Sequence, residues 1–286
     1  MAASNSSSRP EHGRPSDIWA SLLQGNARWV GEVSTAADAR GGPRRTALVD
    51  GQEPRAVILG CSDSRVPAEI LFDQGIGDLF VVRTAGHVVD DAVLGSVQYA
   101  VDALHVNLVV VLGHDRCGAV DAAAQVLGGA ARPDGAIGDV VDKVLPCLHR
   151  AQRAGVAGLE DLVRYHAVAT AEQLQGSASP LLAAIDGGRC SVVAAVYSLD
   201  TGIVTTQVQS SLQLDRSASA ARALALAEEQ VPQQVQQRAH EQVRERAQVP
   251  ARLQVPAQVR REATVDALTP DDGAYVARHG SPRKIW

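Results

Sequence analysis

Two short segments concentrate residues that could bind a metal ion. Residues 61–65 read C-S-D-S-R, and residues 113–117 read G-H-D-R-C. Two thiolates and one imidazole suit zinc, which binds sulfur at about 2.3 Å and nitrogen at about 2.0–2.1 Å. Three protein ligands leave the fourth tetrahedral position open, as in catalytic zinc sites. Cys61, His114 and Cys117 are therefore the candidate ligands of one zinc ion per chain. Taken singly, each of them is more often a buried thiol or a core histidine.

A carboxylate and a guanidinium follow the first candidate ligand at even spacing. Asp63 could accept a hydrogen bond from a metal-bound water and orient it. Arg65 could hold Asp63 with two parallel hydrogen bonds and keep it ionised. We predict that the two residues form a catalytic dyad. The alternative is an ordinary loop salt bridge, which contributes little.

The residues before each motif predict the strands that would bring the motifs together. Residues 56–60 (AVILG) and 107–112 (NLVVVL) are short apolar runs typical of buried parallel strands. Sites in open α/β sheets form outside the carboxyl ends of such strands. If the two strands are neighbours, the candidate ligands meet at one edge of the sheet.

The rest of the chain alternates between helical and strand-like periods, which predicts an α/β fold with a mostly parallel sheet flanked by helices. We expect an N-terminal helical arm at Asp17–Val30, with Ser16 as its N-cap. Further expected helices cover residues 92–104, 119–127, 140–154 and 159–175, and further strands cover residues 79–82, 190–199 and 203–209.

Composition excludes several classes of protein. The chain has 286 residues, 45% of them apolar, enough for a sizeable core. A formal net charge of -5 argues against general nucleic-acid binding. No apolar run reaches the roughly 18 residues of a membrane span, and the polar N-terminus is no secretory signal. Four cysteines without such a signal indicate reduced thiols. We expect a soluble, cytoplasmic protein that binds neither nucleic acid nor membrane.

Three regions differ in composition. We expect residues 1–15 to be disordered, residues 16–212 to form the zinc domain, and residues 213–286 to be a largely disordered extension rich in Gln, Ala and Arg. A short helix is expected within that extension at residues 219–230. The extension is either a solvated tail or a docking segment for a partner.

The paired motifs resemble those of the β-class carbonic anhydrases of bacterial type. The resemblance also covers residues 80–87 (FVVRTAGH), the continuation of the second motif through Val120, residues 22–26 (LLQGN) and residues 99–101 (YAV). It extends over roughly residues 17–210 and leaves the C-terminal extension unexplained.

The resemblance implies the zinc ligands and the catalytic dyad given above, and three residues around the substrate. Gln52 would donate a hydrogen bond to an oxygen of carbon dioxide or bicarbonate, and Phe80 and Tyr99 would form apolar wall. The alternatives are a surface turn for Gln52 and plain core for the two aromatic residues. His87 and Asp115 are candidate proton shuttles.

The function implied is the reversible hydration of carbon dioxide to bicarbonate and a proton by a zinc-bound hydroxide. The nearest alternative is a related zinc hydrolase acting on carbonyl sulfide or carbon disulfide, and a more distant one is a non-catalytic zinc protein. Similar proteins form homodimers or homotetramers, in which the N-terminal helix would embrace a partner. The alternative is that this helix packs on its own subunit. Cys147 and Cys190 are expected to be buried structural thiols, and His105, His149 and His166 are assigned no role in the site.

Overall fold

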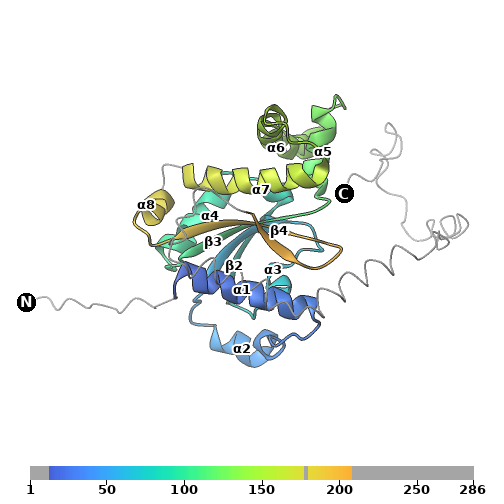
Figure 1. The fold of residues 1–286 in the computed structure, drawn as a ribbon. Helices are drawn as coiled ribbons and strands as arrows, with labels where there is room; N and C mark the ends of the chain where they lie inside the picture. The colour runs from blue at the N-terminus through green and yellow to red at the C-terminus, as the bar shows by residue number, and fades with distance from the viewer. Residues whose placement is uncertain (1–12, 177–179, 208–286) are drawn as a thin grey trace, which may run out of the picture.

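The computed structural model describes residues 13–176 and 180–207, and its architecture is the predicted α/β fold (Figure 1). The expected C-terminal extension, with its short helix, lies outside the described residues. So does the expected N-terminal disorder, except at residues 13–15. There helix α1 (Pro15–Val30) already begins at Pro15, with Arg14 rather than Ser16 at the N-cap. Proline suits the first helical position because its missing N–H would have no partner there.

A mostly parallel sheet lies at the centre of the described residues. Its strands are β1 (Ala56–Cys61), β2 (Leu79–Thr84), β3 (Leu108–His114), β4 (Ser191–Tyr197) and β5 (Val204–Gln207). The order across the sheet is β2-β1-β3-β4-β5, with the first four parallel and β5 antiparallel to β4. The predicted neighbours β1 and β3 are therefore adjacent. Both are buried along their whole length, which explains their unbroken apolar sequences.

Helices cover both faces of the sheet. Besides α1 they are α2 (Gly42–Ala47), α3 (Ala68–Leu71), α4 (Asp91–Asp102), α5 (Gly118–Leu127), α6 (Gly135–Arg153), α7 (Leu159–Gly176) and α8 (Pro180–Asp186), with single 3-10 turns at Asp38–Arg40 and Ala85–His87. The sequence did not predict α2, α3 or α8, each of which is too short for a helical period to show. Helix α6 begins at Gly135, ahead of the expected residue 140. No helix in the described ranges is long and apolar enough to cross a membrane.

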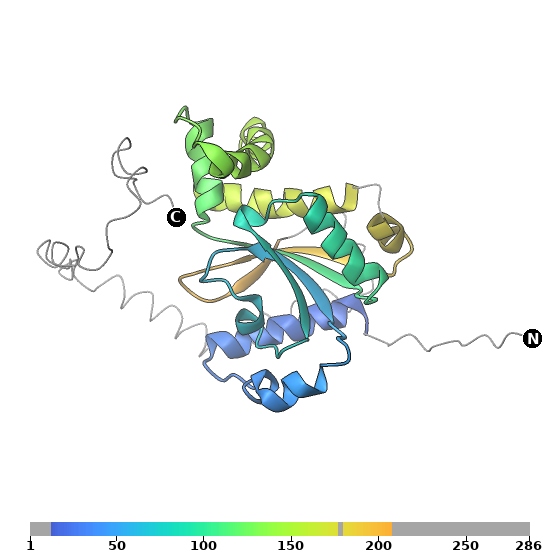
Figure 2. The same ribbon diagram turned by 180° about the vertical axis from the view of Figure 1, so that it is seen from behind.

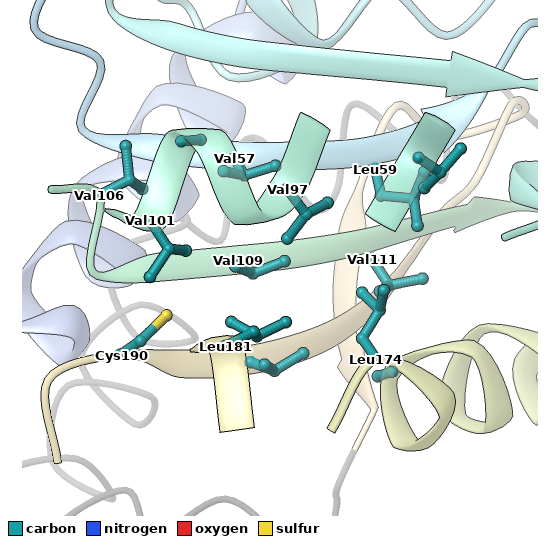
Figure 3. Packing of buried hydrophobic residues seen from close by; sticks show 14 of the residues in the cluster. Val57, Leu59, Val97, Val101, Val106, Val109, Val111, Leu174, Leu181 and Cys190 are labelled. Carbon is teal, nitrogen blue, oxygen red and sulfur yellow. The ribbon is translucent and has the colours of Figure 1, made fainter. Parts of the chain in front are cut away.

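Alternate residues of each central strand face opposite layers. On one face, Val57 and Val109 pack with α4, α7 and α8, and Figure 3 shows Val97 and Val101 of α4 beside them. On the other face, side chains such as Ile58 pack against α1 and α3. Helices α1 and α7 accordingly lie on opposite sides of the sheet in both views (Figures 1 and 2). Helices α5 and α6 form a further cluster with α7.

Helix α1 packs closely on its own chain. A Cβ atom on Gly25 would lie 1.8 Å from the carbonyl oxygen of Phe72, so only glycine allows this approach. The buried Asn26 amide donates to the carbonyls of Leu71 and Gly202, at 3.1 and 2.8 Å, and accepts from the N–H of Val204 at 2.8 Å. These contacts tie α1 to α3 and to β5. They match the alternative expectation for this helix, while an additional contact with a second subunit stays a prediction.

The segment after α1 is anchored on one buried carboxylate. Asp73, whose side chain is 1% exposed, accepts hydrogen bonds from the Arg28 guanidinium at 2.6 Å and the Ser34 hydroxyl at 2.5 Å. It also accepts from the backbone N–H groups of Thr35 and Ala36 and from the Thr35 hydroxyl. Burial alone would raise the pKa of Asp73, but these donors outweigh burial and hold the pKa well below its usual range. The carboxylate is therefore ionised and determines the path of residues 34–36.

Candidate metal centre

Three side chains that could bind a metal meet where β1 and β3 end. Cys61 is the last residue of β1 and His114 is the last residue of β3. Cys117 is the N-cap of α5, three residues after His114. The two sulfur atoms and a ring nitrogen lie within 4.8 Å of one another, and all three residues are buried. The parallel pairing of the two strands brings together residues that are distant in sequence.

The state of His114 fits a metal ligand. Its Nδ1 atom lies 2.7 Å from the carbonyl oxygen of Asp115. A carbonyl oxygen can only accept a hydrogen bond, so Nδ1 carries a proton, and in the neutral imidazole Nε2 keeps its lone pair. That Nε2 atom is buried and has no hydrogen-bond partner among the described residues. A histidine that donates through one nitrogen and presents the other is typical of metal sites. With two sulfurs, the donor set fits zinc.

The two cysteines differ in acidity. The Cys117 thiol hydrogen-bonds to the sulfur of Cys61 and thereby lowers the pKa of Cys61, although burial opposes this shift. The pKa of Cys117 is raised correspondingly, because its proton is held in that hydrogen bond and the side chain is buried. The N–H of Gly86 also donates to the Cys61 sulfur, at 3.3 Å. Both contacts favour a thiolate at Cys61, as a metal ligand requires.

Asp63 and Arg65 form the predicted ion pair beside the candidate ligands. The Arg65 guanidinium donates from Nε and Nη2 to the two carboxylate oxygens, at 2.9 and 2.7 Å. These hydrogen bonds lower the pKa of Asp63 to about 2, against the opposing effect of burial. One Asp63 oxygen lies 3.9 Å from Nε2 of His114. An ionised, fixed hydrogen-bond acceptor therefore lies at the edge of the cluster.

A second arginine supports this loop and was not singled out from the sequence. Arg83 on β2 donates to the carbonyl oxygen of Cys61 at 2.8 Å and to that of Asp63 at 2.5 Å. Arg83 is placed there because it pairs in register with Gly60 on the neighbouring strand. Nothing local in the sequence signals such a contact between strands.

Cys61 and the dyad open into one cleft of about 730 Å³. Arg116 lies at its wall with a left-handed backbone, at φ +51°, and pairs with Asp200 of the β4–β5 turn. The cleft is lined by Cys61, Ser62, Asp63, Ser64, Arg65, Ala85, Arg116 and Gly118.

The residues expected around the substrate lie elsewhere on the chain. Gln52 is exposed in the segment before β1, and Tyr99 on α4 is 51% exposed. Phe80 on β2 is partly buried against the α4 side of the core, with its ring centroid 6.2 Å from that of Tyr99. None of the three is among the residues that line the cleft within one chain.

Of the two expected proton shuttles, one is buried and the other is bound to backbone. His87 is completely buried, and burial lowers its pKa well below the usual value. Both carboxylate oxygens of Asp115 lie within hydrogen-bond distance of the N–H of Leu199, at 3.0 and 3.1 Å. Asp115 therefore fixes the backbone beyond β4.

The other two cysteines are buried away from the cluster, as expected. Burial raises the pKa of Cys147 to about 11 and that of Cys190 to about 12. Both are protonated free thiols in the core.

Comparison with known proteins gives consistent results. Residues 56–204 match the family model described as carbonic anhydrase. Carbonic anhydrase 2 of Mycobacterium tuberculosis is 45% identical over 192 residues, which cover 66% of this chain and 90% of that protein. The β-carbonic anhydrase of Coccomyxa, solved in complex with acetazolamide, is 26% identical with a TM-score of 0.52, covering 66% of this chain and 85% of that one. A structure from Sordaria macrospora, described as a tetrameric β-carbonic anhydrase, has a TM-score of 0.53 at 21% identity, covering 68% and 98%.

Proposed function

This chain belongs to the β-class carbonic anhydrase family, and on that premise we propose that it catalyses the reversible hydration of carbon dioxide to bicarbonate and a proton. We further propose that it does so with one zinc ion held by Cys61, His114 and Cys117. The observation that carries the proposal is the meeting of these three donors within 4.8 Å, beside an ionised Asp63. The alternative hydrolase of carbonyl sulfide or carbon disulfide is not favoured, because the relative at 45% identity is named a carbonic anhydrase.

Each side chain of the site has a separate role in the proposed reaction. Bound zinc supplies a Lewis acid that lowers the pKa of water from 15.7 to about 7. His114 presents Nε2 because its Nδ1–H is held by the Asp115 carbonyl. Asp63 accepts a hydrogen bond from the attacking water and so aims its oxygen lone pair at the carbon of carbon dioxide. Arg65 keeps Asp63 ionised and holds it in place, so Arg65 is the positioning residue of the dyad.

Gln52, Phe80 and Tyr99 remain proposed substrate-pocket residues on the strength of the resemblance. Because they lie outside the cleft of their own chain, this role requires a second copy to bring them to it. We therefore propose a homodimer or homotetramer, to be measured by sedimentation equilibrium. The half-exposed Tyr99 ring and Trp29, which is 38% exposed, suit such a contact. A cytoplasmic location is proposed because thiolate ligands persist in a reducing compartment.

The first test is stopped-flow carbon dioxide hydration on protein of known zinc content. Wild type should hydrate carbon dioxide, and Cys61→Ser should lose zinc and at least about 100-fold in rate. Cys147→Ser is the matched control, since it removes a buried thiol outside the site and should retain both. Asp63→Asn should retain zinc while losing rate, which separates the dyad from the ligands. Wild type without hydration at one zinc per chain, or an active Cys61→Ser, would refute the proposal.

A further inference from the structure

A line of contacts runs from helix α7 to the sulfur of Cys61. The ring nitrogen Nε2 of His166 lies 2.9 Å from the carbonyl oxygen of Gly86. The N–H of the same Gly86 donates to the Cys61 sulfur at 3.3 Å. Gly86 is thus held on one side by a histidine and touches a candidate metal ligand on the other. His166 itself lies outside the cleft and has no role in the mechanism above.

The turn at Gly86 has a left-handed backbone at two successive residues. Gly86 adopts a left-handed conformation at φ +64°, and His87 follows with φ +42°. For a residue other than glycine this conformation costs roughly 1–2 kcal/mol. A Cβ atom on Gly86 would also lie 2.8 Å from the Cβ of Ala119, so α5 packs directly on this turn. The position of the Gly86 N–H therefore depends on the contacts around the turn.

His166 is built as a fixed hydrogen-bond donor. It is buried on α7, and because a carbonyl oxygen can only accept, its Nε2 atom carries the proton. The ring of the fully buried His87 packs against it, with centroids 4.5 Å apart and planes inclined by 35°. Burial lowers the pKa values of both histidines, which keeps the pair neutral. The donor has one geometry and points at Gly86.

We propose that His166 is a positioning residue of the metal centre: it holds Gly86 so that its N–H stays directed at the Cys61 sulfur. The inference rests on the proposed metal site. A hydrogen bond to a thiolate withdraws electron density from sulfur and fixes its orientation. Outer-shell partners of metal ligands typically contribute 10–100-fold in metal affinity or activity.

Two substitutions of equal length separate the donor from the bulk of the side chain. In His166→Gln, the side-chain amide can donate to the Gly86 carbonyl from near the position of Nε2. His166→Met has a similar length and no donor. We expect Met to weaken zinc affinity about tenfold, measured by competition with a chromogenic chelator, and Gln to restore most of the loss. In cobalt-loaded protein, the thiolate-to-cobalt charge-transfer band should move to lower energy in Met and return toward wild type in Gln.

Leu174→Ala is the control for a purely structural effect. It opens a cavity in the core two turns further along α7, and should lower the melting temperature while leaving zinc affinity and the cobalt band unchanged. Should the Met variant not fold, His166→Phe keeps an aromatic ring without the donor and replaces it in the comparison. Wild-type zinc affinity and band energy in the donor-free variant would overturn the inference alone. Wild-type protein that binds no zinc would overturn the proposed site as well.

Discussion

The buried carboxylate of Asp73 allows a stability prediction through Asp73→Asn, which removes the charge and keeps the size. Asn tolerates the left-handed backbone of this position, φ +48°, so the change does not add backbone strain. The new amide group would face donors such as Arg28 and Ser34, which now contact carboxylate oxygens. Because Arg28 is partly exposed, its charge stays solvated, and the loss is that of hydrogen bonds to a charged group, about 1.5–3 kcal/mol. We expect the free energy of unfolding at neutral pH to fall by a similar amount.

The pH dependence of this loss follows from the lowered pKa of Asp73. Folding favours the charged form, so the stabilisation is complete above the unfolded carboxyl pKa of about 3.9. It is lost as the pH falls below that value toward the lower pKa of the folded state. Wild type should therefore lose stability more steeply than Asp73→Asn in this acidic range. The difference between the two proteins should shrink as the pH falls.

Urea titrations followed by tryptophan fluorescence would measure both effects at one protein concentration. Trp19 is a suitable probe, because its ring lies 6.0 Å from that of Phe72, next to Asp73. Asp142→Asn is the control: it breaks an exposed pair with Arg132 and should leave the midpoint unchanged. A loss below about 1 kcal/mol in Asp73→Asn, or a constant difference from wild type down to the lowest pH, would refute the reasoning.

Three further outcomes are expected. Arg83→Met should lower kcat for carbon dioxide hydration roughly tenfold without loss of zinc, because the carbonyl groups of Cys61 and Asp63 would lose the donor that positions them. Stopped-flow kinetics together with metal analysis would measure both quantities. Unchanged kcat would contradict this prediction. Gly25→Ala should lower the melting temperature by roughly 5 °C or more in calorimetry, since its Cβ would collide with the Phe72 carbonyl, and an unshifted transition would count against that packing. Removing zinc with a chelator should lower the unfolding midpoint, and adding zinc but not magnesium should restore it. Zinc at 100 times its Kd should raise the free energy of unfolding by about 2.7 kcal/mol. Equal recovery with magnesium would argue against the sulfur ligands.

The central strands and the meeting of the candidate ligands could be predicted because short, continuous segments of sequence carry the signals for both. Strands β1 and β3 are unbroken apolar runs, and each is followed at once by its motif. The rule that sites form at the carboxyl ends of neighbouring parallel strands supplied the remaining step. The pairing of Asp63 with Arg65 was predictable for the same reason, since the two residues are near neighbours in the chain.

Contacts between distant segments were not predictable from a single sequence. Arg83 reaches Cys61 through strand register, and His166 reaches Gly86 through the packing of α7 on the turn after β2. Neither arginine nor histidine carries a local signal of such a contact. The sequence therefore gave no reason to assign His166 a role. Short helices such as α3 are likewise fixed by packing rather than by periodicity.

The two sulfur ligands are far apart in the sequence, and this separation affects the entropy of the unfolded chain. An ion held by Cys61 and Cys117 would close a loop containing β2, α4 and β3. If the ion stays bound during unfolding, this loop lowers the entropy of the unfolded chain. In the loop-closure model used for disulfides, the free energy of the unfolded chain then rises by about 4 kcal/mol at 25 °C. His114 adds little, because it lies three residues from Cys117. The metal would act as a cross-link that lowers the entropy of the unfolded chain. Acid or a chelator, rather than a reductant, would open this cross-link.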